Sequence, residues 1–284
     1  MPQPLKIIKN RIRSVENAKK VTHAMEMVSV AKLNQIDKVL FALRPYQTEL
    51  ETMMSNLMGA NQEFKNPFFE KRLHLKRFVL CVVTSDNGLC GLYNYNILRA
   101  ADKFIEKNGK DNVDLILIGK KGVNYFKKKN IPVLHQYVGL NGRYDRMISD
   151  EITGILVKLF LSHKADEIHV AYTYFRTGFL QDAVIDLFLP VKDGEKKTGE
   201  YLLEPDFSTL IDQITFRYLL GKMRLAFLQA FTSEHATRSL SMRAATSNGE
   251  ELLDGLVLLR NKIRQANITQ EMLEIISSSE ALKG

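Results

Sequence analysis

One short segment of this 284-residue chain combines residues that could do chemistry. The segment from Ser85 to Gly91 (SDNGLCG) follows an apolar run and precedes a helical pattern, the position of the phosphate loop in nucleotide-binding folds. It matches neither GxGxxG nor GxxxxGK(S/T), and no lysine follows it to meet a phosphate. The sequence therefore predicts a structural turn between a strand and a helix rather than a phosphate site.

Catalytic and metal-binding patterns are also missing from the sequence. Asp86 and Cys90 could be imagined as an acid and a nucleophile, but no histidine lies near them in the sequence to activate the thiol. The six histidines form no dyad or triad pattern, and the two cysteines, Cys81 and Cys90, show neither metal-ligand spacing nor a disulfide framework. We therefore expect no catalytic residues, no metal, no cofactor and a reducing compartment.

The composition describes a folded basic protein. A hydrophobic content of 45% and a charged content of 25% suit a globular chain, and the net charge of +8 favours acidic partners such as nucleic acid, an anionic membrane or acidic protein loops. No run of 18 apolar residues predicts a membrane span. The first 14 residues lack an apolar signal core, so no export signal or transit peptide is expected.

The middle of the chain alternates short apolar runs with helical patterns. The runs are rich in β-branched residues and have the length of buried strands in a parallel sheet. Predicted strands span 78–84, 113–118, 131–134, 167–174 and 183–189, and predicted helices span 93–107, 120–129 and 146–163. This alternation predicts a small α/β domain with a largely parallel sheet.

Both ends of the chain carry long helical patterns. One runs from Leu5 to about Met58 with a kink expected at Pro45, and the other runs from about Ser208 to Leu282 with Asp206 or Ser208 as its cap. The second helix would be about 110 Å long, too long for a compact core to bury, so the two are expected to pair antiparallel. Steps of three and four residues predict contact seams at Val21, Met25, Val28, Leu33, Ile36, Leu40 and Leu43, and at Leu252, Leu256, Leu259, Ile263 and Ala266.

These patterns predict four segments: an N-terminal coiled-coil helix (1–58), a connecting loop (59–75), a central α/β domain (76–205) and a C-terminal coiled-coil helix (206–284). Basic residues crowd the first helix between Lys6 and Lys20, where the only acid is Glu16. This face could be merely solvated, or it could contact acidic loops of a partner.

Several long stretches resemble one family. They are KKVTHAMEMVSVAKL (19–33) with Arg-Pro-Tyr at 44–46, SDNGLCG (85–91), SEHATRSLSMRAATSN (233–248) and RQANITQEMLEI (264–275). In order and spacing they are similar to the gamma subunits, the central rotor shafts, of F-type ATP synthases, and the resemblance covers essentially the whole chain. It implies an α/β fold class, with a long antiparallel coiled coil of the terminal helices plus an inserted Rossmann-like α/β domain without a bound nucleotide.

The resemblance also implies a function and partners. The chain would be a non-catalytic central-stalk rotor of a proton-translocating ATP synthase, coupling rotation of the membrane c-ring to ATP synthesis or hydrolysis at the beta subunits. Three alpha and three beta subunits would surround one copy, with the epsilon subunit and the c-ring at its foot. Membrane contact would come only through the complex, at the cytoplasmic face of a bacterial plasma membrane, and no nucleic acid would bind.

Carried over residue by residue, the resemblance implies two sets of contact residues. Coupling contacts to alpha and beta would be Met25, Arg238, Arg264, Gln265, Thr269, Glu271 and Glu274, with Met25 near acidic lever loops of beta. Foot contacts to epsilon and the c-ring would be Cys90, Gly91, Tyr93 and Asn94. The last turns beyond Ile275 would rotate in an apolar sleeve formed by the hexamer.

Two other classes of protein would share some of these features. A basic coiled-coil nucleic-acid-binding protein would use the N-terminal helix, but its basic residues alternate with a seam and no aromatic stacking platform accompanies them. An enzyme built on the α/β domain would need a ligand at the strand ends, where the sequence offers no recognisable motif.

Overall fold

The computed structural model describes residues 3–60, 66–70, 72, 76–176, 181–191 and 206–281. Of the expected connecting loop at 59–75, residues 61–65, 71 and 73–75 lie outside these ranges, residues 59–60 belong to a helix, and Pro67–Phe69 form a 3-10 helix (η1). The chain divides into two compact units, an α/β unit (Ser29–Arg238) and a paired-helix unit (Met1–Val28 with Ser239–Gly284). Helices α1 (Gln3–Ala60) and α5 (Phe207–Ala281) contribute residues to both units.

The α/β unit contains a five-stranded sheet with the order β3-β2-β1-β4-β5. Its strands are β1 (Phe78–Val83), β2 (Val113–Ile118), β3 (Val133–Tyr137), β4 (Glu167–Phe175) and β5 (Gln181–Leu189). Pairing is parallel from β3 to β4, and only β5 runs antiparallel, against β4. The largely parallel sheet expected from the alternating pattern is therefore confirmed.

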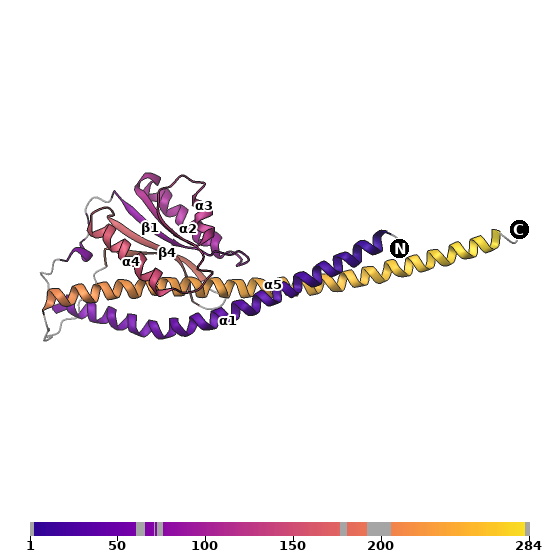
Figure 1. Ribbon diagram of the computed structural model, residues 1–284, viewed down its shortest axis with the longest axis horizontal. Coiled ribbons are helices and arrows are strands. Elements are labelled where there is room, and N and C mark those ends of the chain that lie inside the picture. The colour runs from indigo at the N-terminus through magenta and orange to yellow at the C-terminus, as the bar shows by residue number, and fades with distance from the viewer. Residues whose placement is uncertain are drawn as a thin grey trace. The chain divides into compact units, whose positions relative to one another are not determined.

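Helices cover both faces of the sheet (Figure 1). They are α2 (Tyr93–Asn108), α3 (Lys120–Phe126) and α4 (Arg146–Leu161), together with parts of α1 and α5. In β1, the side chains of Phe78, Leu80 and Val82 pack with α2 and α3, whereas those of Val79, Cys81 and Val83 belong to the core that also holds α4, α1 and α5. A strand buried on both faces explains why FVLCVV is apolar without alternation.

In the α/β unit, α1 and α5 run as uninterrupted helices. α1 continues through Pro45 as one element, although proline has no N–H to donate to the carbonyl of Phe41. Asp206 caps the start of α5, since its carboxylate accepts from the Thr209 N–H at 2.9 Å. Cap and helix bounds agree with the sequence prediction, and the kink itself stays a prediction.

In the paired-helix unit, polar pairs join α1 to α5 in antiparallel register. Lys19 contacts Glu250 at 3.1 Å, Thr22 shares a hydrogen bond with Thr246 at 2.7 Å, and Glu26 accepts from Arg243 at 2.8 Å. Further toward the N-terminus of α1, an apolar cluster of Ile8, Ile12 and Leu256 is packed by Val15, Leu253, Val257 and Ile263. The seam is thus apolar at one end and polar at the other.

Part of the predicted seam is wrong by one residue. Val21, Val28, Leu252 and Leu259 are exposed, and the buried side of α1 at this point carries Thr22, Glu26 and Ser29 instead. The helical period was predicted correctly, but two neighbouring sets of residues share that period, and the more apolar set was taken as the contact face. The structure pairs polar side chains across the helices, which satisfies them without an apolar contact. Ile36, Leu40 and Leu256 are buried as predicted.

The C-terminal part of α5 has no apolar partner among the described residues. If the register of the polar pairs continues, the start of α1 lies beside about Gln265. Beyond it, apolar side chains are exposed at Ile268, Met272, Leu273, Ile275 and Ile276. Within the described residues, no helix combines the length and the apolar character that crossing a membrane requires.

Candidate functional site

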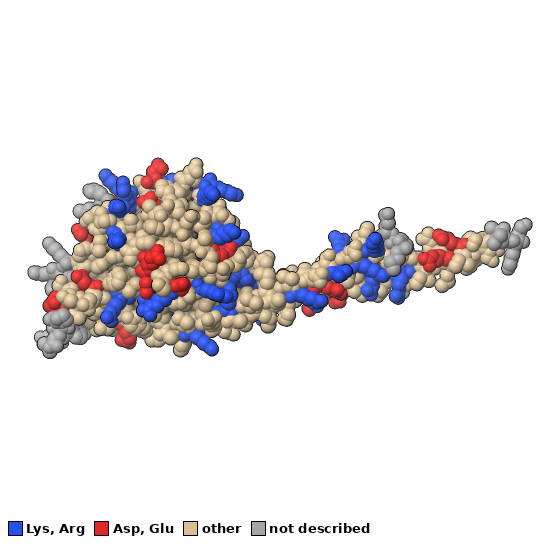
Figure 2. Space-filling view, in the orientation of Figure 1, with Lys and Arg blue, Asp and Glu red and all other residues tan. Residues whose placement is uncertain are grey.

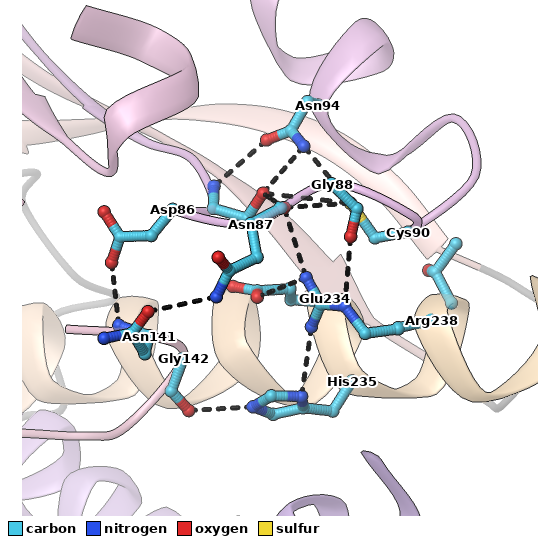
Figure 3. A network of polar contacts seen from close by, with 12 residues as sticks. Asp86, Asn87, Gly88, Cys90, Asn94, Asn141, Gly142, Glu234, His235 and Arg238 are labelled. Carbon is cyan, nitrogen blue, oxygen red and sulfur yellow. Dashed lines mark hydrogen bonds and ion pairs between the residues drawn. The ribbon is translucent and has the colours of Figure 1, made fainter. Parts of the chain in front are cut away.

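A buried polar network lies where the loops after β1 and β3 meet α5, inside the α/β unit (Figure 3). Its centre is formed by Glu234, His235 and Arg238, which are exposed by 1%, 1% and 6%. Spacings of three and four residues place these side chains on one face of α5. That face is directed at the SDNGLCG segment and at the loop around Asn141 and Gly142.

Asp86 ties three loops together. Its carboxylate accepts hydrogen bonds from the backbone N–H groups of Lys120, Gly139 and Asn141 at 2.9, 3.1 and 2.7 Å. These donors lie just after β2 and β3, so one side chain fixes the loops at the carboxyl ends of three neighbouring strands. Asp86 is therefore bonded as a structural anchor, and no acid role is needed to explain it.

Cys90 is enclosed by its own turn. Asn94, in the first turn of α2, donates to the Ser85 hydroxyl at 2.7 Å and to the Cys90 sulfur at 3.2 Å. Leu89 and Gly91 have positive φ values of 61° and 54°, which bend the chain back on itself. Burial raises the pKa of the Cys90 thiol, which disfavours the thiolate that nucleophilic chemistry needs.

Arg238 contacts the turn that corresponds in the chain to the phosphate loop of a nucleotide-binding fold. Its guanidinium donates to the carbonyl oxygens of Asn87 and Gly88 at 3.3 and 3.2 Å. A phosphate loop presents N–H groups to an anion, whereas this turn presents carbonyl groups to a cation. The geometry therefore supports the structural turn predicted from the sequence.

Glu234 balances the charge of Arg238. The two side chains form an ion pair with 2.8 Å between Nη2 and Oε1, but neither carboxylate oxygen has hydrogen-bond geometry to a described residue. The Tyr93 hydroxyl, also buried, has no hydrogen-bond partner among the described residues either. Burial raises the pKa of Glu234, and the charge of Arg238 opposes that rise. Glu234 is thus a buried carboxylate stabilised mainly by one cation.

His235 is held as a neutral imidazole. Its Nε2 lies 2.9 Å from the carbonyl oxygen of Gly142, which can only accept, so Nε2 carries the proton. Nδ1 is then free to accept from the Arg238 guanidinium at 3.3 Å. Gly142 permits this contact because its φ is +65° and a Cβ there would come within 2.5 Å of the His235 ring.

The His235 contacts predict a dependence of stability on pH. Burial lowers the pKa of His235 to about 4, below its ordinary value of 6.5. Between these two pH values the imidazole is protonated in the unfolded chain and neutral in the folded chain. The free energy of unfolding should therefore fall as the pH drops from about 6.5 to 4, by roughly 3 kcal/mol from this group. Urea unfolding of the chain and of His235→Gln across this range measures the difference. Parallel curves for the two proteins would contradict the prediction.

The predicted foot residues are mostly turned inward. Cys90 and Tyr93 are buried, Asn94 is half-buried, and only Gly91 is exposed. The same turn exposes Leu89, Leu92 and Tyr95 by 60%, 65% and 57%. Cys90, Tyr93 and Asn94 therefore shape this surface from within, while three neighbours that the sequence analysis did not select form its apolar exterior.

The predicted coupling residues fall into two groups. Arg264, Gln265, Thr269, Glu271 and Glu274 are exposed on α5, and Met25 is half-buried on α1. Arg238, in contrast, is buried, and its guanidinium binds Glu234 and two backbone carbonyl groups of the same chain. The sequence analysis also missed the roles of Glu234, His235 and Gly142. The spacing of Glu234 and Arg238, four residues apart on a helix, was the available signal.

Metal ligation is not part of this arrangement. In the ranges that the structure describes, no group of three or more His, Cys, Asp or Glu side chains could hold an ion. The fold and the site together define a class of protein in which two long terminal helices pair and a Rossmann-like domain is fastened to one of them by buried polar contacts.

Comparisons with known proteins identify the family within this class. A family model described as ATP synthase matches residues 4–282. The ATP synthase gamma chain of Protochlamydia amoebophila is 34% identical, covering 98% of this chain and 99% of the relative. That of Geobacter sp. (strain M21) is 35% identical, covering 99% of each. The chain belongs to the ATP synthase gamma-chain family.

Solved structures agree with the fold. A chain in the cryo-EM structure of the Euglena gracilis mitochondrial ATP synthase (OSCP, F1 and c-ring) superposes with a TM-score of 0.72 and 16% identity, covering 99% of this chain and 95% of that one. A chain in the Tetrahymena thermophila central stalk and c-ring structure superposes with a TM-score of 0.62 and 20% identity, covering 79% and 99%. As a family member, the chain is a non-catalytic rotor subunit of the central stalk, and the nucleic-acid-binding alternative is not supported.

Proposed function

We propose that this chain turns inside a bacterial ATP synthase and transmits torque between the membrane c-ring and the beta subunits, where the bond chemistry takes place. Three alpha and three beta subunits surround one copy of the chain, and epsilon joins it at the foot. The complex lies at the cytoplasmic face of the plasma membrane, which the chain meets only through its partners.

One observation supports this proposal beyond family membership: the exposed apolar end of α5. Met272, Leu273, Ile275 and Ile276 are each more than half exposed. Such a run on a helix past the end of its pairing partner requires cover from other chains. An apolar sleeve formed by the hexamer provides that cover, and its few directional bonds suit a helix that rotates within it.

Torque is transmitted through contacts that differ among the three beta subunits. A shaft that presents different side chains to three identical partners biases each of them toward a different state, which is the differential contact that coupling requires. The exposed polar residues from Arg264 to Glu274 carry such contacts on α5. Met25 on α1 meets acidic lever loops of beta. Lys and Arg side chains, blue in Figure 2, gather along the paired helices, where they would attract such loops.

Arg238 and the foot residues act less directly. Arg238 positions the 87–88 turn against α5, so it supports the coupling surfaces rather than touching alpha or beta. Leu89, Leu92 and Tyr95, shaped from beneath by Cys90 and Asn94, form the foot surface toward epsilon and the c-ring.

Assembly tests the proposal. The chain is co-expressed with alpha and beta subunits from the same source, and native mass and ATPase rate are measured. We expect an active complex of three alpha, three beta and one copy of this chain. If alpha and beta show the same mass and rate without it, the proposed function is wrong.

A further inference from the structure

A cavity of about 340 Å³ opens beside α1 in the α/β unit and shares only Gly142 with the labelled residues of Figure 3. α1 contributes one wall, the loop that follows β3 another, and Leu228 of α5 part of the floor. The volume lies at the lower end of the range for small-molecule sites, enough for a compact ring system rather than a peptide.

Two cations line this cavity without an acid among its lining residues. Lys32 donates one hydrogen bond, to the Asn141 carbonyl at 2.8 Å, which leaves two of its three donors. Arg143 is exposed, and its side chain makes no hydrogen bond or ion pair with a described residue. Burial, followed by the charge of Arg143, lowers the pKa of Lys32, and the charge of Glu234 opposes this change. Glu234 itself is paired with Arg238.

Apolar side chains line a second part of the cavity, next to the polar Gln35. Ile36 and Leu228 are buried, and Val39 keeps 43% of its surface exposed at the cavity wall. Tyr144 adds an aromatic face that is half-buried. Apolar groups deep in a site and two cations at its side form complementary halves for a ligand that is apolar at one end and anionic at the other.

We propose that this cavity binds a small amphipathic anion, an aromatic or bicyclic body with one carboxylate or phosphate group, and that Lys32 and Arg143 hold the anionic group. The apolar body lies over Val39, Leu228 and Tyr144. None of its lining residues belongs to the proposed coupling or foot residues, so it adds a ligand site to the rotor subunit.

Isothermal titration of the full chain with 1-naphthyl phosphate tests the site. We expect 1-naphthyl phosphate to bind at one site per chain. Inorganic phosphate and the neutral 1-naphthalenemethanol should each bind at least tenfold more weakly. Arg143→Gln should weaken binding about tenfold, since a charge-assisted hydrogen bond is lost, and Lys32→Gln should do so by a similar factor. 1-Naphthoate in place of the phosphate shows which anionic group is preferred.

Lys38→Gln is the matched control, because Lys38 is an exposed lysine on the same helix and does not line the cavity. It should bind as the unchanged chain does. Equal affinity of Arg143→Gln and Lys38→Gln would overturn the proposal, as would tight binding of 1-naphthalenemethanol. Arg143 lacks contacts that folding needs, so its variant stays informative even if Lys32→Gln misfolds.

Discussion

Replacing Arg238 by Met lowers the free energy of unfolding by about 3–5 kcal/mol, the effect expected when one partner of a buried ion pair is removed. Glu234 would keep a carboxylate that is 1% exposed and pairs with no other cation among the described residues. The carbonyl groups of Asn87 and Gly88 would lose their donor as well. Urea unfolding of the full chain, followed by circular dichroism, measures the change.

Two further variants make this test specific. Arg217→Met changes an exposed arginine of the same helix and should alter stability by less than about 0.5 kcal/mol. Adding Glu234→Gln to Arg238→Met removes the unpaired charge and should restore a large part of the loss. If Arg238→Met unfolds at the same urea concentration as Arg217→Met, the ion pair does not stabilise the fold as described.

Replacing Met25 by Lys slows rotation in the assembled complex about tenfold while leaving assembly unchanged. The new cation would pair with the acidic lever loops of beta, and an ion pair that adds about 1.4 kcal/mol to each rotational barrier corresponds to a tenfold slower step. The measurement is ATP-driven ion pumping per ATP hydrolysed in membrane vesicles, together with the ATPase rate.

Met27→Lys supplies the matched control for this prediction. Met27 is 51% exposed on the same helix, two residues away and therefore on a different face. Met25→Leu keeps the position apolar and should pump normally. An ATPase rate that is unchanged in Met25→Lys, or equally reduced in Met27→Lys, would place the beta contact elsewhere on α1.

The sequence by itself determined the elements and the sheet class. The runs at 78–83 and 113–118 are short, almost continuously apolar and rich in β-branched residues, which predicts strands buried on both faces. In the structure, both core clusters contain side chains from each run. The long terminal helices followed from period and from the absence of proline after Pro205. Local pattern is enough where burial and periodicity agree.

The phase of the helix pairing was decided by the tertiary structure. Val21 and Thr22 are adjacent, and either stripe has the helical period. Only the position of Thr246 and Arg243 on the facing helix selects the polar stripe, because those groups satisfy Thr22 and Glu26. Such a choice depends on the partner surface, which a single helix pattern does not contain.

The role of Arg238 was also decided by tertiary structure. Its sequence neighbours indicated a polar helix face, and the family resemblance implied a contact to alpha or beta. Within the chain, its guanidinium reaches carbonyl groups 150 and 151 residues away, and the contact to alpha or beta stays a prediction. Contacts between such distant segments form only once the sheet has placed the ends of β1 and β3 beside α5. They cannot be predicted from the sequence, because every residue has a backbone carbonyl group and nothing in the local pattern marks which of these groups stays unpaired.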